Sequence, residues 1–158
     1  MHQKKFLKYR GIEMERLDYR KIGSESWNNL GLMAKSLDNG VLNHRLLELV
    51  KLRASQINGC ANCVNLHANR LRNDNVEEEV IQNVVVWWEA KCFDEREKAA
   101  LEWTDSVTLV SENRVPDEIY KRVKSQFNDE ELVDLTFAVC TINVHNRLAV
   151  AFRRIPGS

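Results

Sequence analysis

Prolines and glycines are scarce in this chain, which has two prolines and six glycines among its 158 residues. No stretch of useful length alternates between apolar and polar residues as a half-buried strand does, whereas apolar residues recur at three- and four-residue spacing along most of the chain. No internal repeat or low-complexity tract is evident. The length suits one domain with a hydrophobic core, and we expect that domain to be all-α.

The sequence also lacks an excess of charge of either sign, since it contains 23 Lys and Arg and 23 Asp and Glu residues. A nucleic-acid-binding protein normally carries a basic excess or stripe, so nucleic acid is not an expected partner. No apolar run approaches the about 20 residues that span a bilayer. The basic start, MHQKKFLKYRGIE, lacks the apolar stretch of a secretory signal. We therefore expect a cytoplasmic protein without a membrane segment.

Apolar spacing and capping residues predict about six to seven helices. Asn43 suits an N-cap, and Asp94 and Asn128 are each followed three residues later by a glutamate, as in a capping box. The expected helices cover residues 24–37, 43–57, 60–72, 76–90, 94–107, 116–127 and 128 to about 152.

Two of these helices have informative apolar patterns. In the segment 76–90, we expect Val80, Val84 and the pair Trp87–Trp88 to form a stripe that faces the core. The last helix is apolar on nearly all sides. It is therefore expected at the centre of the fold or in a subunit interface.

Residues 59–67 read GCANCVNLH, with two cysteines three positions apart and a histidine four residues after the second. Covalent haem attachment needs a histidine directly after the second cysteine, where this chain has Val64. A thioredoxin-type site lies between a strand and a helix, but here the preceding segment is helical. Structural zinc needs four donors. Cys60, Cys63 and His67 supply three, so zinc remains an alternative.

A redox-active dithiol on a helical scaffold explains the motif best. At a helix N-terminus, Cys60 and Cys63 lie on neighbouring positions of one turn and can close a disulfide, and the positive end of the helix dipole lowers a thiol pKa. His67 follows Cys63 by one turn on the same face and can take its proton. Cys92 and Cys140 have apolar neighbours, and we expect both to be small buried hydrophobic residues.

A family resemblance extends this interpretation. The stretch ELVKLRASQINGCANCVNLHANRLR at 48–72 resembles the core of the alkylhydroperoxidase D-like proteins, within the carboxymuconolactone decarboxylase superfamily. Its pattern is a glutamate, eleven residues, and then Cys-x-x-Cys-x-x-x-His. The resemblance implies an N-terminal extension at 1–13 and one such helical domain at 14–158. Further similar segments are 16–22, 93–108, 115–120 and 130–153.

The resemblance implies a thiol peroxidase that needs no cofactor. In this family Cys63 would attack the peroxide, Cys60 would resolve the sulfenic acid, and His67 and Glu48 would form a proton relay. Some relatives carry a second histidine between the cysteines, where this chain has Asn62. The implied partners are a hydroperoxide, an external dithiol such as a lipoyl protein or a thioredoxin-like protein, and further copies of the chain in a homotrimer or homohexamer.

Two other functions stay open. One is a redox sensor or disulfide-switch protein with little turnover, and the other is a lactone decarboxylase, although such enzymes do not depend on a dithiol. Arg53 and Gln56, on the same helix as the relay glutamate, are expected to position it or to bind substrate. We expect His145 to be a structural or interface residue, and His44 and His2 to lie on the surface.

Overall fold

The regular structure is entirely helical between residues 15 and 155, the range that the computed structural model describes. This confirms the all-α prediction. Seven longer α-helices lie in this range, as predicted, and α1 and α7 are additional helices of four residues each. The expected extension at 1–13 and His2 lie outside the described residues. The elements are α1 (Tyr19–Ile22), α2 (Ser24–Asp38), α3 (His44–Ile57), α4 (Ala61–Asn73), α5 (Glu78–Asn83), η1 (Val84–Val86), α6 (Glu95–Thr108), α7 (Val110–Asn113), α8 (Asp117–Lys124) and α9 (Asp129–Ala151).

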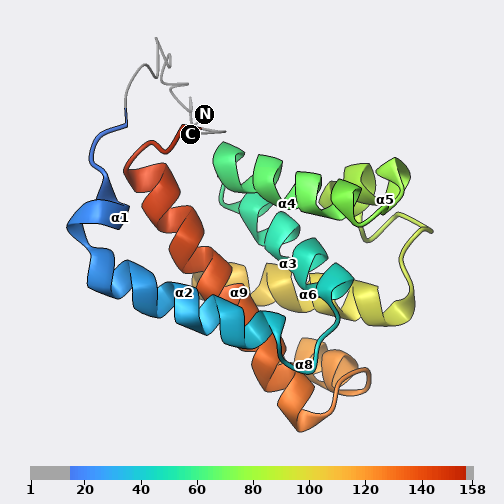
Figure 1. Cartoon of the computed structure of the whole chain (residues 1–158). Helices are drawn as coiled ribbons and strands as arrows, with labels where there is room; N and C mark the ends of the chain where they lie inside the picture. Colours follow the sequence, from blue (N-terminus) through green and yellow to red (C-terminus); the bar gives the residue numbers. More distant parts are fainter. Residues whose placement is uncertain (1–14, 156–158) are drawn as a thin grey trace, which may run out of the picture.

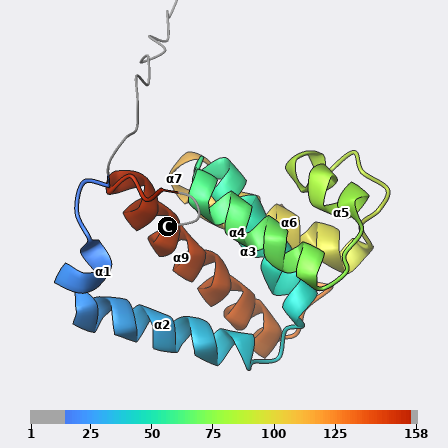
Figure 2. The same ribbon diagram turned by 45° about the horizontal axis from the view of Figure 1, so that its top comes forward.

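Helix α9 occupies the centre of the fold, where it contacts α2, α3, α4, α6 and α8. Figures 1 and 2 show α9, in orange and red, with α2 along one side and α3 and α4 along the other. Leu135, Val139 and Ile142 of α9 are buried, which confirms the central position. No helix among residues 15–155 combines the length and the apolar character needed to cross a bilayer.

Side-chain caps begin three of the main helices where the sequence predicted them. Asn43, Asp94 and Asn128 each accept a hydrogen bond from the backbone N–H three residues further on, over 2.7–2.9 Å. Glu97 and Glu131 accept hydrogen bonds from the backbone N–H groups of their cap residues, which completes two capping boxes. Because α3, α6 and α9 pack against one another, these caps fix where the three central helices begin.

The segment 76–90 differs from the single helix that was predicted. The short helix α5 gives way to the 3-10 turn η1 and then to irregular turns. Trp88 is 54% exposed and so leaves the expected core stripe. Two causes end the α-helix here: Val84–Val86 is a run of β-branched residues, which α-helices disfavour, and the carbonyl of Val85 accepts a hydrogen bond from Arg53 Nη1 over 3.1 Å.

The two cysteines outside the motif do not both belong to the core. Cys92 is half-buried and Cys140 is exposed, which corrects the expectation that both are buried. Helix α9 turns Val139 and Ile142 towards its neighbours, and Cys140 lies between them on the outward side. An apolar sequence on every side of a helix does not tell which side faces solvent.

Candidate active site

A tight turn between α3 and α4 places the cysteine pair. Asn58 is the C-cap of α3, and Gly59 follows with a φ of +66°, a left-handed conformation that favours glycine. The N–H groups of Gly59 and Cys60 donate to the carbonyls of Gln56 and Ser55, respectively, which is the Schellman pattern. The chain then enters α4 with Cys60 as its N-cap residue, as predicted.

Cys60 and Cys63 form a disulfide in this structure, with Cα atoms 5.3 Å apart. The Sγ of Cys60 also accepts a hydrogen bond from the backbone N–H of Cys63 over 3.3 Å. Both residues are buried, and Ala149 of α9 packs with them. The structure thus brings the predicted pair together in its oxidised state.

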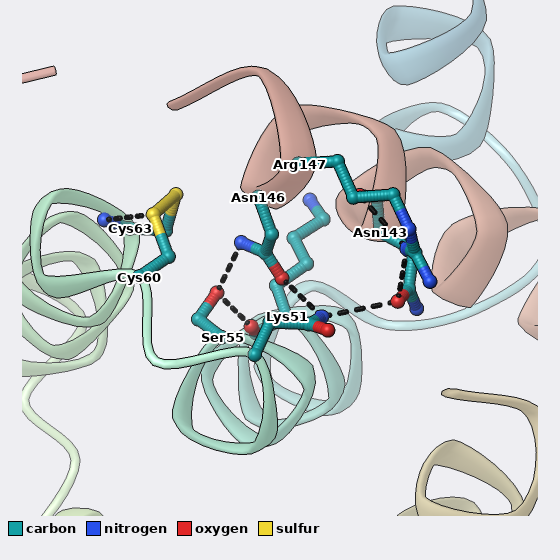
Figure 3. The surroundings of a disulfide bond; sticks show 8 residues. Lys51, Ser55, Cys60, Cys63, Asn143, Asn146 and Arg147 are labelled. Atoms are coloured by element: carbon teal, nitrogen blue, oxygen red, sulfur yellow. Dashed lines mark hydrogen bonds between the residues drawn. A yellow bond between two sulfur atoms is a disulfide. The ribbon is translucent and has the colours of Figure 1, made fainter. Parts of the chain in front are cut away.

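An amide network holds the end of α3 against α9 beside the disulfide (Figure 3). Asn58 Nδ2 donates to the Oδ1 atoms of Asn143 and Asn146 over 3.0 and 2.9 Å. Asn146 Nδ2 donates in turn to Ser55 Oγ over 3.0 Å, and Arg147 Nη1 donates to Asn143 Oδ1 over 2.6 Å. The network ties the turn that carries Cys60 to the central helix.

We expect Asn146→Ala to lower the free energy of unfolding by about 2 kcal/mol, because the side chain is fully buried and its removal deprives the half-buried Asn58 amide and the buried Ser55 hydroxyl of a partner. Urea unfolding followed by circular dichroism measures the change. Asn73→Ala, at the exposed end of α4, is the control and should change the free energy by less than about 0.5 kcal/mol. Equal small changes in both variants would contradict the prediction.

Helices α3 and α4 lie side by side (Figure 2) and bring the two predicted relay residues together. The Nδ1 atom of His67 lies 2.7 Å from Glu48 Oε2. Both side chains are buried, and Glu48 is completely enclosed. His67 lies one turn after Cys63 on α4, so a single pair of packed helices carries all four predicted site residues.

Two cations that the sequence analysis did not single out complete the surroundings of Glu48. Lys51 Nζ donates to Glu48 Oε1 over 3.0 Å and to Asp38 Oδ1 on α2 over 2.8 Å, and Arg70 Nη1 donates to Glu48 Oε1 over 3.3 Å. Burial by itself raises the pKa of Glu48. The hydrogen bond from His67 and the charges of His67 and Lys51 outweigh burial and lower this pKa to about 2. Glu48 is therefore ionised.

Burial lowers the pKa of His67, although its hydrogen bond to Glu48 acts in the opposite direction. The imidazole is therefore neutral near pH 7. Because an ionised carboxylate only accepts hydrogen bonds, we assign the ring proton to Nδ1, and Nε2 keeps its lone pair. His67 thus presents a base on the side away from Glu48.

A cavity of about 550 Å³ opens beside the cysteine pair, between α2, α4 and α9. Of the two motif cysteines, Cys63 lines it, together with His67, Lys51 and Arg70. The lining therefore combines titratable or charged groups with apolar side chains, as is typical of a site for a small organic ligand. Its apolar lining includes Trp27, Ala34, Leu37, Leu66, Ala138 and Ile142.

His145 of α9 lines the same cavity, a position that the sequence did not indicate. Its ring packs edge-on against Trp27, with ring centroids 5.2 Å apart. Burial lowers the pKa of His145 to about 4, and nearby His67, Lys51 and Arg70 add to the effect. A single histidine on an apolar helix carries no local signal of a cavity that forms only when another helix packs beside it.

We expect the protein to lose stability as the pH falls from about 6.5 to 4. An unfolded histidine titrates near 6.5, whereas the native pKa of His145 is about 4 and that of His67 is also lowered. The neutral rings stabilise the fold above pH 6.5. Below pH 6.5 the unfolded state binds more protons than the native state. His145 alone then lowers the free energy of unfolding by about 2 kcal/mol, a value reduced because part of its ring faces water.

Urea unfolding at several pH values between about 7 and 4 measures this loss. In His145→Phe, which cannot titrate, the decrease over this range should be smaller by about 2 kcal/mol. An identical pH dependence in the variant and the wild type would contradict the prediction.

The structure does not place Arg53 beside Glu48, so the expectation that it positions this glutamate is wrong, whereas substrate binding by Arg53 stays a prediction. Arg53 follows Glu48 by five residues, which turns it to a different side of α3, where its guanidinium donates to both carboxylate oxygens of Asp105. The Oε1 atom of Gln56 is buried without a hydrogen-bond partner among the described residues, so this oxygen does not position the Glu48 carboxylate. His44 is exposed, as expected.

The donor set considered for zinc is not assembled in this structure, because the two motif sulfurs are bonded to each other and Nδ1 of the motif histidine faces Glu48. Within residues 15–155, Asp38, His44 and Glu48 bring three possible ligand atoms within 4.8 Å of one another. Lys51 Nζ already bridges the two carboxylates among them. This group of side chains therefore fits an ammonium rather than a metal ion.

The model of the carboxymuconolactone decarboxylase family matches residues 24–106, a range that holds both cysteines of the motif and both predicted relay residues. The chain belongs to this family, and it is an alkylhydroperoxidase D-like member of the superfamily. The uncharacterized protein YdfG of Bacillus subtilis is 36% identical to it over 137 residues, which make up 87% of this chain and 93% of YdfG.

Solved structures agree with this assignment. A crystal structure of a protein of unknown function from Agrobacterium tumefaciens, for which an antioxidant defence role of the AhpD kind has been suggested, is 37% identical, with a TM-score of 0.89 over 92% of this chain and 99% of that one. The debrominase Bmp8 shares the fold at 14% identity, with a TM-score of 0.75 over 87% of this chain and 74% of its own. The fold therefore serves more than one chemistry.

Proposed function

We propose that this protein is a thiol-dependent peroxidase that reduces hydroperoxides through a dithiol–disulfide cycle. The proposal depends on one observation: Cys63 and His67 line the same cavity. Cys63 is bonded to Cys60 at a helix N-terminus, and His67 contacts the carboxylate of Glu48. The antioxidant role suggested for the Agrobacterium tumefaciens relative supports the same function.

In the reduced protein, Nε2 of His67 takes the proton of the Cys63 thiol, and ionised Glu48 stabilises the imidazolium. The thiolate attacks the terminal peroxide oxygen and the O–O bond breaks. The leaving alkoxide takes the proton from His67. A hydroperoxide is thereby reduced to an alcohol, and Cys63 is oxidised to a sulfenic acid.

The Cys60 thiol then attacks the Cys63 sulfur, water leaves, and the disulfide found in this structure forms. An external dithiol, such as a lipoyl group or a thioredoxin-like protein, reduces the disulfide by thiol–disulfide exchange. Each turn of the cycle consumes one hydroperoxide and two thiols of the reductant. None of these steps requires a metal, a haem or a flavin.

A redox sensor is the second candidate, and one observation favours it. The exposed fractions of Cys60 and Cys63 are only 2% and 4%, so a bulky reductant has little access to the disulfide in this conformation. A sensor would form the same bond but would be reduced slowly. A lactone decarboxylase, by contrast, has no use for the dithiol.

Peptide mass mapping tests the proposal. Reduced protein receives one equivalent of tert-butyl hydroperoxide, and we expect Cys60 and Cys63 to become linked and free dithiol to restore them. A variant with Cys92→Ser and Cys140→Ser is the control and should behave identically. Failure of the pair to become linked would contradict the peroxidase. Linkage without turnover in the presence of lipoamide or thioredoxin would favour the sensor.

We also propose that the protein assembles as a homotrimer or homohexamer through the outward face of α9. Val133, Phe137 and Val144 are each about half exposed, and their spacing of four and seven residues places them on one stripe. Leu32 and Met33 of α2 are also exposed. Monomeric proteins rarely expose a continuous apolar surface of this kind, and the resemblance to alkylhydroperoxidase D-like proteins supports a trimeric unit.

Phe137→Glu should dissociate this assembly, because a charge in the middle of an apolar interface loses its hydration without gaining a partner. Light scattering should give a multiple of the 18.4 kDa chain for the wild type and 18.4 kDa for the variant. Val110→Glu changes an equally exposed valine on α7 and should leave the mass unchanged. A monomeric wild type would contradict the proposal.

A further inference from the structure

The proposed cycle leaves a histidine of the cavity without a role. His145 lines the same cavity as Cys63 and His67, but it comes from α9 rather than from α4. Ala149, four residues later on α9, packs against both cysteines. Four residues along a helix correspond to a rise of about 6 Å, so His145 lies one turn along α9 from the residue that packs with the cysteine pair, on a cavity that Cys63 also lines.

The ring of His145 is held by packing rather than by hydrogen bonds within the part of the chain that the structure describes. The edge-on contact with Trp27 fixes its place, at a centroid distance of 5.2 Å, and among residues 15–155 no hydrogen bond to its nitrogens is formed. Polar groups that are largely buried usually have a partner in the protein or in bound water or ligand. His145 lines the cavity, so its ring nitrogens are available to water or to a ligand that occupies that cavity.

The surroundings keep this imidazole neutral. Burial and the cations on α3 and α4 lower its pKa to about 4, so at neutral pH it has one N–H donor and one lone pair. The charged and titratable groups that share the cavity with it are Tyr19, Arg20, Asp38, Lys51, His67, Arg70 and Arg154.

We propose that His145 is a second catalytic imidazole, which donates a hydrogen bond to the oxygen that leaves when Cys63 attacks a hydroperoxide. The inference rests on the proposed peroxidase function. As the O–O bond breaks, its electron pair moves to the leaving oxygen and Cys63 gains the other oxygen. His67 delivers the proton, while His145 keeps its own and stabilises the developing negative charge. A donor fixed in advance at such a position acts mainly on the transition state.

Two substitutions separate this role from packing. His145→Phe keeps an aromatic ring against Trp27 but removes the donor, whereas His145→Gln keeps an N–H donor but loses the ring. Both are made in the Cys60→Ser background, so that the sulfenic acid on Cys63 accumulates. The rate of its formation with tert-butyl hydroperoxide is followed with a sulfenic-acid probe, and urea unfolding checks the fold.

We expect the second-order rate constant to fall about 10- to 100-fold in His145→Phe and to stay within about 3-fold in His145→Gln. The pH profile of the remaining rate should keep its shape, because His67 still transfers the proton. Equal rates in all three proteins, equal losses in both variants, or a loss confined to His145→Gln would overturn the inference. No sulfenic acid in the parent Cys60→Ser protein would instead remove the proposed function, a result distinguishable from the others.

Discussion

Cys63→Ser should reduce peroxide consumption by at least about 10³-fold, which is the largest effect that we expect from any single substitution. A thiolate is a strong nucleophile towards an O–O bond, whereas a serine hydroxyl stays protonated near neutral pH. The assay follows hydroperoxide loss in the presence of a dithiol such as dihydrolipoamide. Substantial turnover by Cys63→Ser would exclude the proposed mechanism.

Cys60→Ser should behave differently, although the two sulfurs are bonded to each other in the structure. Cys63 lines the cavity and keeps its base, so it should still consume one equivalent of peroxide. The reaction then stops, because no neighbouring thiol resolves the sulfenic acid. Trapping with a sulfenic-acid reagent and mass spectrometry should locate the adduct on Cys63. If the two variants exchanged these behaviours, the assigned roles of the cysteines would be reversed.

Outside the two cysteines, Glu48→Gln should have the largest effect, with a loss of about 3 kcal/mol of stability and an about 10²-fold fall in the rate of Cys63 oxidation. The carboxylate is fully buried and accepts hydrogen bonds from His67, Lys51 and Arg70. A neutral amide leaves the nearly buried ammonium of Lys51 without part of its compensation. It also removes the charge that stabilises the imidazolium.

Urea unfolding and stopped-flow peroxide kinetics measure the two effects of Glu48→Gln separately. The pKa of Glu48 is lowered to about 2, so its stabilising contribution is complete above about pH 4.5 and is lost as the pH falls towards 2. The variant should therefore be less sensitive to pH in that range. Glu89→Gln, at an exposed position, is the control and should leave stability and rate unchanged. A fully active and stable Glu48→Gln would show that the relay is not built on this carboxylate.

Most of the fold follows from local signals in the sequence. Asn43, Asp94 and Asn128 mark helix starts because a capping side chain and its target N–H lie only three residues apart. Likewise, Gly59 predicts the end of α3 because a left-handed residue there suits glycine. The segment 76–90 was predicted less well. Its apolar spacing suits a helix, but the chain turns after α5, where Arg53 of α3 donates a hydrogen bond to the carbonyl of Val85.

The candidate site was predictable only as far as one motif reaches. The motif residues Cys60, Cys63 and His67 lie within the first two turns of α4, so their spacing alone predicts that they are close together. Glu48 was added by the family resemblance. The amide network beside the disulfide joins Asn58 to a residue 88 positions later, and no local pattern reports such a pairing. The same holds for the cavity, whose walls come from helices that are far apart in the chain. Residues on those walls are recognised only once α2, α4 and α9 are packed.

The position of Cys63 on the cavity wall also determines the order of events in a peroxidase built on this site. Of the two motif cysteines, Cys63 lines the cavity, so a reductant that attacks this sulfur would need the space that the oxidant uses, and the two could not be bound there together. Such a peroxidase would alternate between the dithiol and the disulfide form and release the alcohol before the second substrate binds, which is a double-displacement scheme. An excess of either substrate would then exclude the other from the shared cavity. The turnover rate would therefore depend on the ratio of the oxidant and reductant concentrations.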